Sequence, residues 1–550
     1  MCRNGRGRVL REKMHMTGVE RMKGLRSAAA EVGEKKTEKS LIVLLMLVGM
    51  IVRLAALGQC PGGVHQDEAY SAYEAYCMIT DGMDSWGYRY PVYLTTWGSG
   101  MNALQSYLMM PFIALFGLKT WVLRLPQALL ACATLPVIYS LLKRMFSKET
   151  AVICLAFLVI CPWQITMARW GLESNMAPGM ILLGFWAFVK GVQNPKYYVL
   201  SALFYGVSLY AYATIWPVLP FMILLHALYL WYVGKMKWNR WLFAGVLLLG
   251  VLALPLVLFL VVNWDMIGEI RTPFMSIPRM LEFRTGDISL NHLYENVYRL
   301  VKTFLLQRDD RVWNASDEFG LYYHISLPFI AVGAISCLIS TVKSLKTRRY
   351  HGGVLILIWL ILGGVLGCLI DGNVNRLNIL HFPLIICAVV GIQSVCKWVN
   401  KRINWFGKAI ATAYALCFLL FVGFYFTEYQ NLIAPQFNRG LEEAVEFAKG
   451  VADKEEIIHV SDWISYPKIL FYDEMEPDVF RSTVEWRWKK HPYMMINAAG
   501  RYVFETIDEY DQSGVYIMVR DRMSDEIPDS SEMECFGQIA VVYPADPKKN

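Results

Sequence analysis

Two adjacent carboxylates, Asp67 and Glu68, are the side chains in this sequence best suited to chemistry, and His65 stands just before them. An ionised carboxylate can take a proton from a hydroxyl group as a general base, and paired carboxylates bind divalent cations. The same pair also suits a solvated loop or the acidic first turn of a helix. A divalent metal ion is the one cofactor that the sequence suggests, with Asp67 and Glu68 as candidate ligands.

A third acid and two arginines extend this set. Glu173 follows Arg169 in the segment ARWGLESN, and Arg376 lies in the segment NRLN. The planar guanidinium group of arginine binds phosphate through two parallel hydrogen bonds. Arg376 would equally well reach the lipid headgroups from the end of a membrane-spanning helix. A phosphate site and a membrane anchor therefore both remain open for Arg376.

The composition indicates that membrane-spanning helices position these residues. Of the 550 residues, 55% are hydrophobic and 18% are charged, whereas about a quarter of the residues are charged in soluble domains. The mean hydropathy is +0.35, and apolar blocks near the length of about 20 residues that a span needs recur along the chain. We predict about eleven transmembrane helices, near 41–58, 121–142, 151–168, 178–193, 197–214, 216–233, 241–262, 321–342, 353–370, 376–396 and 408–426.

Basic residues set the expected orientation. Residues 1–40 carry eleven Lys and Arg residues, and such segments stay in the cytoplasm. Counting Met101–Phe116 as a span would place the basic loop at 143–148 outside, so we interpret it as a juxtamembrane or re-entrant helix. We therefore expect a multi-pass protein of the plasma membrane, with its N-terminus in the cytoplasm and with Asp67 and Glu173 outside. The net charge of +7 lies mainly in residues 1–40 and in short loops, which argues against nucleic acid as a partner.

Three segments follow from this pattern. Residues 1–40 form a basic cytoplasmic segment, and residues 41–426 form the transmembrane domain, whose first outer loop, 59–120, holds the acidic pair. Residues 427–550 are polar and mixed in character. Their short apolar runs near 457–461, 502–506, 515–519 and 539–543 alternate with helical periodicity. We expect a small extracytoplasmic α/β domain there.

The order of these motifs resembles a known enzyme family. Asp67-Glu68 after the first helix, the Trp97–Tyr107 segment, Arg124-Leu125-Pro126, Arg169 with Glu173, and the NRLN segment at 375–378 carry the resemblance. Together they are similar to the GT-C glycosyltransferases, the superfamily of protein O-mannosyltransferases and of the lipid A aminoarabinose transferase. The resemblance covers most of residues 41–400. It implies a membrane enzyme that uses a sugar donor linked to polyprenyl phosphate.

The resemblance also implies roles for the candidate residues. Asp67 would be the general base of an inverting transfer, and Glu68 would orient the acceptor or bind the metal. Glu173 stands where relatives often have aspartate, and the difference leaves its catalytic role open. Substrate contacts would come from His65, with Arg376 and then Arg169 as candidates for holding the donor phosphate. The acceptor would be a glycan, a lipid or a protein.

Two other functions compete with this one. A transporter or lipid flippase places ionisable residues near the middle of the bilayer, often on broken helices from internal repeats. Here the acids cluster in expected outer loops and no repeat is evident. A membrane anchor that only presents the C-terminal domain would not need eleven helices and a large charged loop. We therefore favour the glycosyltransferase.

Overall fold

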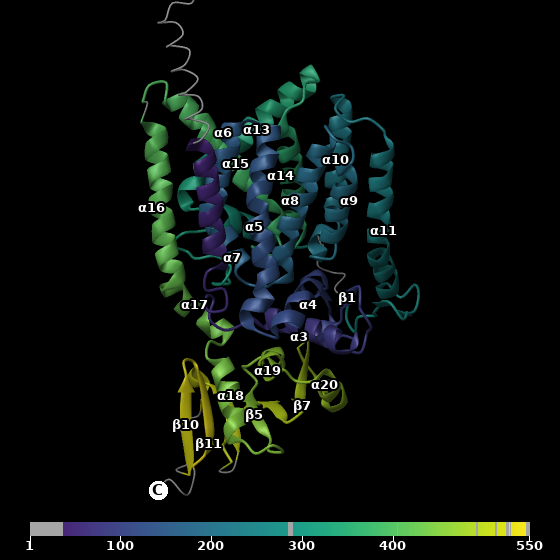
Figure 1. Ribbon diagram of the computed structural model, residues 1–550, viewed down its shortest axis with the longest axis vertical. Coiled ribbons are helices and arrows are strands. Elements are labelled where there is room, and N and C mark those ends of the chain that lie inside the picture. Colours follow the sequence, from purple (N-terminus) through teal and green to yellow (C-terminus); the bar gives the residue numbers. More distant parts are fainter. Residues whose placement is uncertain are drawn as a thin grey trace, which may run out of the picture.

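A helical bundle and a smaller domain at one of its ends make up the structure (Figure 1). The structure is a computed structural model that describes residues 37–283, 290–403, 405–490, 493–511, 514–523, 527 and 530–545. Helices α3 and α4 lie between the bundle and the smaller C-terminal domain (Figure 1). We call this end of the bundle the loop end.

Each of the eleven segments expected to span the membrane overlaps a helix of the bundle, and the segment 151–168 is covered by two consecutive helices. The first of these helices covers residues 37–54, which is about four residues earlier than expected. The other bundle helices are α5 (Thr120–Met145), α6 (Lys148–Ile160), α7 (Pro162–Ala168), α8 (Glu173–Gly191), α9 (Tyr197–Ser208), α10 (Leu219–Tyr232), α11 (Arg240–Asn263), α13 (Leu327–Thr347), α14 (Gly352–Leu369), α15 (His381–Val399) and α16 (Phe406–Phe426).

The helices of the bundle differ in length. Among the described residues, six are long and apolar enough to cross a membrane, and they are α5, α11, α13, α14, α15 and α16. Helices α6 and α7 make a seventh if the pair, bent by 57°, is taken as one span. Helices α9 and α10 have 12 and 14 residues, fewer than the roughly 20 that a full span needs. The count of eleven is consistent with this bundle, but length alone supports six or seven spans.

The long loop between the first helix and α5 is largely helical. Helix α3 (Gln66–Asp81) begins at the acidic pair, and α4 (Leu104–Phe116) has only 13 residues. Helix α4 is therefore too short to cross the bilayer, and it lies at the loop end as expected for a juxtamembrane helix (Figure 1). Short strands β1 (Tyr93–Leu94) and β2 (Met101–Asn102) pair in an antiparallel manner between the two helices.

The C-terminal domain has the expected α/β character. A seven-stranded sheet has the order β10-β11-β9-β5-β8-β7-β6, in which β5 is parallel to β8 and β9 and the other pairs are antiparallel. The strands are β5 (Ile458–Ser461), β6 (Glu485–Lys490), β7 (Tyr493–Ala499), β8 (Tyr502–Glu505), β9 (Val515–Val519), β10 (Ser531–Phe536) and β11 (Ile539–Pro544). The helices are α17 (Glu428–Phe437), α18 (Leu441–Val451), α19 (Tyr466–Asp473) and α20 (Pro477–Thr483).

Helix α3 belongs to the core of this C-terminal domain. Tyr70 and Tyr73 are fully buried and pack in the same apolar cluster as the central strands of the sheet. The hydroxyl of Tyr73 donates to the carbonyl of Met475 at 3.0 Å, and the Tyr70 and Tyr466 hydroxyls are 2.9 Å apart. The C-terminal domain thus fixes the helix that carries the acidic pair.

Candidate functional site

The N-terminus of α3 presents the acidic pair. His65 is the N-cap residue, and its ring Nδ1 accepts the backbone N–H of Asp67 at 3.3 Å. Glu68 completes a capping box, because its side chain accepts the backbone N–H of His65 at 3.0 Å. Carboxylates in the first turn of a helix are stabilised by the positive end of the helix dipole. The local sequence therefore both starts the helix and holds Asp67 at its tip.

A buried ion pair fixes this tip to the bundle. The Nε and Nη2 atoms of Arg124, on α5, donate to the two oxygens of Glu68 at 2.9 and 3.1 Å. Both side chains have no exposed surface. The backbone N–H of Gly171 also donates to Oε1 of Glu68, at 2.6 Å. One carboxylate thus joins α3, α5 and the segment that leads into α8.

This geometry corrects the roles expected for Glu68. Its two oxygens already accept four hydrogen bonds and it faces away from solvent. A buried carboxylate in this state is not placed to orient an acceptor or to bind a metal ion. We assign it a positioning role, in which it sets the places of Asp67 and of the segment before Glu173.

The structure also places Arg169 away from the phosphate-binding position that we expected for it. Its guanidinium group is buried and donates to the carbonyl oxygens of Val52, Ala55 and Cys60 at 2.7–2.9 Å. These carbonyls lie at the C-terminal end of the first helix and just beyond it. Cations are favoured at such an end because the last carbonyls have no partner within the helix. Arg169 therefore stabilises the helix end and does not line the cavity described next.

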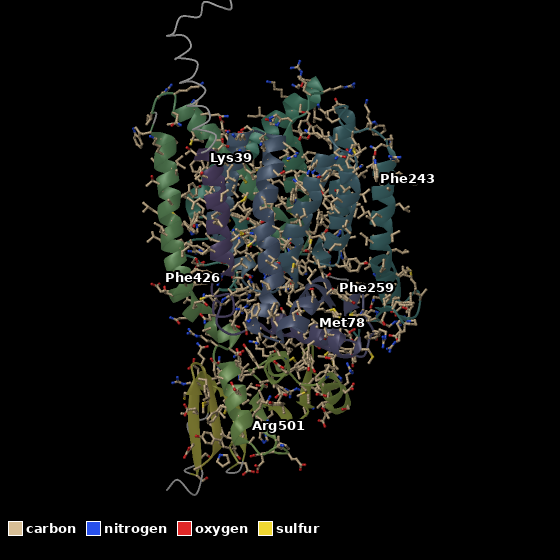
Figure 2. All side chains as sticks on the ribbon, in the orientation of Figure 1. Lys39, Met78, Phe243, Phe259, Phe426 and Arg501 are labelled. Atoms are coloured by element: carbon tan, nitrogen blue, oxygen red, sulfur yellow. The ribbon has the colours of Figure 1, made fainter. Side chains whose placement is uncertain are left out.

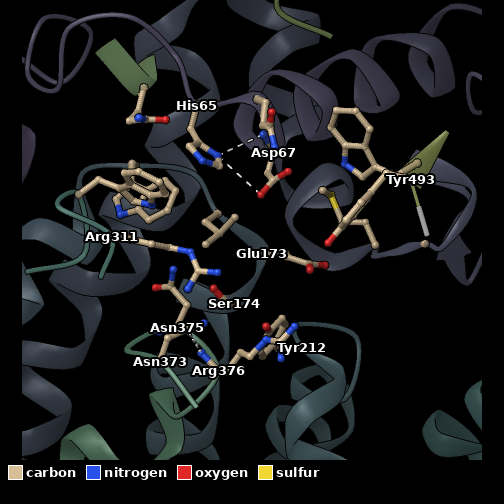
Figure 3. A pocket seen from close by; sticks show the side chains of 18 of the residues that line it. His65, Asp67, Glu173, Ser174, Tyr212, Arg311, Asn373, Asn375, Arg376 and Tyr493 are labelled. Carbon is tan, nitrogen blue, oxygen red and sulfur yellow. Dashed lines mark hydrogen bonds and ion pairs between the residues drawn. The ribbon is translucent and has the colours of Figure 1, made fainter. Parts of the chain in front are cut away.

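The remaining candidates meet at one cavity of about 770 Å³. Figure 3 shows the carboxylates of Asp67 and Glu173 pointing into it, with Arg376 on another side. The cavity is lined by His65, Gln66, Asp67, Trp97, Gly100, Met101, Trp170, Leu172, Glu173, Ser174, Tyr212, Arg311, Trp313, Asn373, Asn375, Arg376, Gln436, Tyr493 and Met495. Of the six residues selected from the sequence, four line this cavity: His65, Asp67, Glu173 and Arg376.

The cationic side of the cavity contains a residue that the sequence analysis did not select. Arg311 and Arg376 both line the cavity (Figure 3). Arg311 belongs to the segment RDDRVWN, in which the acids suggest an ordinary solvated loop. In the structure, the carboxylate of Asp309 accepts the backbone N–H of Val374 at 2.8 Å. In the sequence, the only sign of Arg311 as a site residue is a pair of arginines that flank two aspartates. The contact that brings this segment close to Arg376 forms between residues far apart in the chain.

A second, more apolar cavity of about 300 Å³ adjoins the first. The two share Gly100, Glu173, Tyr212 and Arg376. The other lining residues of the second cavity are mainly apolar and include Trp216, Leu260, Phe283, Leu366 and Ile370. Arg376 therefore stands at the junction between a polar compartment and an apolar one.

The electrostatics of His65 bear on its role. Burial lowers the pKa of His65 to about 3, so the imidazole is neutral at neutral pH. Its 3.6 Å approach to the Asp67 carboxylate is therefore not an ion pair. The ring packs against Trp170 and Trp313, with centroids 5.3 and 5.6 Å away. His65 acts as a neutral wall of the cavity that also fixes the backbone of Asp67.

The side chains at the cavity do not form a suitable set of ligands for a metal ion. Among the residues that the structure describes, no three His, Cys, Asp or Glu side chains cluster in a way that could hold one. Asp67 is the one member of the expected metal pair that reaches the cavity, since Glu68 is committed to Arg124. We therefore derive no step that uses a metal.

Comparisons with known proteins agree with this architecture. Residues 103–264 match the family model described as dolichyl-phosphate-mannose-protein mannosyltransferase. Among curated protein sequences, none matches the chain. The fold is similar to that of ArnT from Cupriavidus metallidurans in its apo state, with 16% identity, a TM-score of 0.53, and coverage of 92% of this chain and 98% of ArnT.

A second structure of ArnT, bound to undecaprenyl phosphate, is similar with 14% identity and a TM-score of 0.55. This match covers 91% of the present chain and 97% of that protein. The expected resemblance to the GT-C glycosyltransferases is confirmed in the fold. The family match and the fold together indicate a glycosyltransferase.

The buried ion pair of Glu68 with Arg124 predicts different melting temperatures for Glu68→Gln and Asp67→Asn, although both substitutions replace a carboxylate with an amide. Glu68→Gln leaves Arg124 charged and buried without its counterion, and breaking such a pair costs about 3–5 kcal/mol. Asp67→Asn changes a side chain that reaches the cavity. We expect Glu68→Gln to lower the melting temperature of the detergent-purified protein by several degrees and Asp67→Asn to leave it near wild type. Equal melting temperatures for all three proteins would contradict the assigned role of Glu68.

Proposed function

We propose that this protein transfers a sugar from a polyprenyl-phosphate-linked donor to an acceptor hydroxyl, with inversion at the anomeric carbon and with Asp67 as the general base. The observation that carries the proposal is the place of Arg376 at the junction of the polar and apolar cavities. A lipid-linked sugar has the matching character: an apolar chain, a phosphate and a polar ring.

The phosphate fits the cationic side of the cavity. Arg376 and Arg311 are the two arginines among the described residues lining it, and arginine presents a fork that matches phosphate oxygens. The Arg376 guanidinium donates to the Asp371 carbonyl at 3.2 Å and is 3.8 Å from the Asp371 carboxylate. These contacts hold the guanidinium group at the cavity edge. The prenyl chain would extend along the second cavity, past Leu260 and Leu366.

The chemistry follows from the position of Asp67. The acceptor hydroxyl oxygen forms a bond to the anomeric carbon as the bond from that carbon to the phosphate oxygen breaks. The phosphate leaves with the bonding electron pair and is stabilised by the arginines, while Asp67 takes the hydroxyl proton. Glu173 faces the same space, and its Oε2 accepts the backbone N–H of Asn102. We propose that Glu173 orients the sugar, in the place of the aspartate of relatives.

The sidedness of the bundle supports transfer outside the cytoplasm. Figure 2 places Lys39, near the start of the first helix, at the end of the bundle opposite Met78 in α3 and Arg501 in the C-terminal domain. Helix α11 begins with Arg240 at that same end, since Phe243 lies near it and Phe259 lies near the loop end (Figure 2). Basic loops face the cytoplasm. We propose that the loop end and the C-terminal domain are extracytoplasmic, at the plasma membrane.

The first test removes the basicity of Asp67. We expect Asp67→Asn to slow transfer by about 10²–10⁴-fold, the usual contribution of general base catalysis. The measurement is the rate at which membranes consume lipid-linked sugars extracted from a strain lacking the gene, followed by mass spectrometry. Asp508→Asn, at an exposed position of the C-terminal domain, is the matched control and should behave as wild type. Wild-type consumption by Asp67→Asn would refute the assignment of the base.

The second test addresses sidedness through a natural cysteine. Cys535 is exposed on β10, whereas the other described cysteines are buried or partly buried. We expect a membrane-impermeant maleimide to label Cys535 on intact cells, because the proposed topology places β10 outside. The Cys535→Ser variant should lose that label. If the label that depends on Cys535 forms only after lysis, the domain is cytoplasmic and the proposed orientation is wrong.

A further inference from the structure

The side of the cavity away from the arginines has a different chemical character. In Figure 3, Tyr493 lies across Asp67 and Glu173 from Arg311. Trp97, which contacts Tyr493, and Met495 of the same strand as Tyr493 also line the cavity. Arg311 and Arg376 are the two Lys or Arg side chains among the described residues that line the whole cavity. The aromatic surface formed by Trp97 and Tyr493 is therefore separate from the proposed phosphate side.

Trp97 occupies this surface in a strained backbone conformation. Its φ of 59° and ψ of 4° lie in the left-handed region, which bulky residues rarely adopt. The neighbouring Gly98 and Gly100 also have positive φ, and a Cβ on Gly100 would come within 2.4 Å of the Tyr93 ring. Strain of this kind persists where the surroundings enforce it, and it clusters at ligand sites.

Aromatic neighbours from α3 and from the C-terminal domain hold the indole in place. Trp97 is 6% exposed and packs edge-to-face on Tyr70 and Tyr466, with centroids 5.0 and 5.4 Å away. The ring of Tyr493 lies 6.5 Å from that of Trp97 at an angle of 88°, and Tyr493 is 42% exposed. Two perpendicular aromatic planes, one from the first loop and one from β7, thus form a corner at the cavity.

We propose that Trp97 and Tyr493 form the acceptor subsite, and that this subsite takes a neutral sugar ring of a glycan acceptor. The C–H bonds on one face of a pyranose ring carry partial positive charge, which the negative face of an aromatic ring attracts. The cavity lining also contains the amide side chains of Gln66 and Gln436, a type of group that can hydrogen-bond to sugar hydroxyls. Among the residues whose side chains the structure describes, the Lys and Arg residues of the cavity lining are Arg311 and Arg376, which we assign to the phosphate, so a neutral ring suits the two aromatic faces.

The position of the subsite agrees with the direction of the reaction. The placement of the acceptor rests on the proposed function. In-line displacement puts the entering hydroxyl on the opposite side of the anomeric carbon from the leaving phosphate. With the phosphate at Arg311 and Arg376, the acceptor lies on the side of Tyr493, and Asp67 stands between the two (Figure 3). The C-terminal domain then contributes directly to acceptor choice.

The test measures binding of defined oligosaccharides to the purified full-length protein in nanodiscs by saturation-transfer NMR. The probes are maltotriose, mannotriose and chitotriose, with trigalacturonate as the anionic comparison. We expect at least one neutral trisaccharide to bind through its ring protons. Tyr493→Ala should weaken that binding about tenfold, whereas Tyr493→Phe, which keeps the aromatic face, should retain it. Trp463→Ala, at an aromatic residue of the same domain that is 60% exposed and outside the cavity, is the matched control.

Three results would overturn the subsite: no neutral trisaccharide binds, Tyr493→Ala binds as wild type does, or trigalacturonate binds more tightly than the neutral sugars. Undecaprenyl phosphate binding, measured on the same preparations, separates this inference from the proposed function. Lipid binding without trisaccharide binding refutes the acceptor subsite alone. Trisaccharide binding that depends on Tyr493, without lipid binding, supports the subsite and refutes the lipid-linked donor.

Discussion

The buried ion pair between Glu68 and Arg124 is the constraint on which the site depends. All five N–H groups of Arg124 are used: three donate to the carbonyls of Leu57, Pro61 and Gly63, and two donate to Glu68. Removing two charges from water costs several kcal/mol per ion, and only such complete pairing compensates for the loss. A loop that follows the first helix is thereby held in one conformation. Asp67 points into the cavity because its neighbour points away from it.

The C-terminal domain contributes a second constraint. The Lys468 ammonium, buried in α19, donates to the Gln436 carbonyl and to Oδ1 of Asn438 at 2.8 and 2.5 Å. The carbonyl of Phe437 accepts the backbone N–H of Val64, next to the N-cap of α3, at 2.9 Å. Burial lowers the pKa of Lys468 to about 7. The C-terminal domain is therefore part of the site, because it contacts the segment at the start of α3 and contributes Tyr493 to the cavity lining.

The sequence was sufficient for elements that are defined by apolar runs or by local caps. The eleven helical segments, the buried strands β5, β8, β9 and β11, and the position of Asp67 at a helix start all follow from such local signals. Strands β6, β7 and β10 were missed: EWRWKK and SEMECF are too polar to read as strands, and YMMINAA in β7 lacks the β-branched and aromatic alternation that marks one. Whether a charged side chain faces a cavity or a buried partner depends on residues far along the chain. For that reason the sequence did not indicate that Glu68 and Arg169 have buried partners or that Arg311 lines the cavity.

We propose that Arg376 holds a lipid phosphate where the polar and apolar cavities meet. The most direct measurement is the affinity of the purified protein for undecaprenyl phosphate, compared between wild type and Arg376→Lys. Lysine keeps the charge but loses the two-pronged geometry, so the account predicts at least about tenfold weaker binding, since a charge-assisted hydrogen bond contributes about 1.5–3 kcal/mol. Arg402→Lys, which alters an exposed arginine outside both cavities, should bind as wild type does. Equal affinity in wild type and Arg376→Lys would contradict the account.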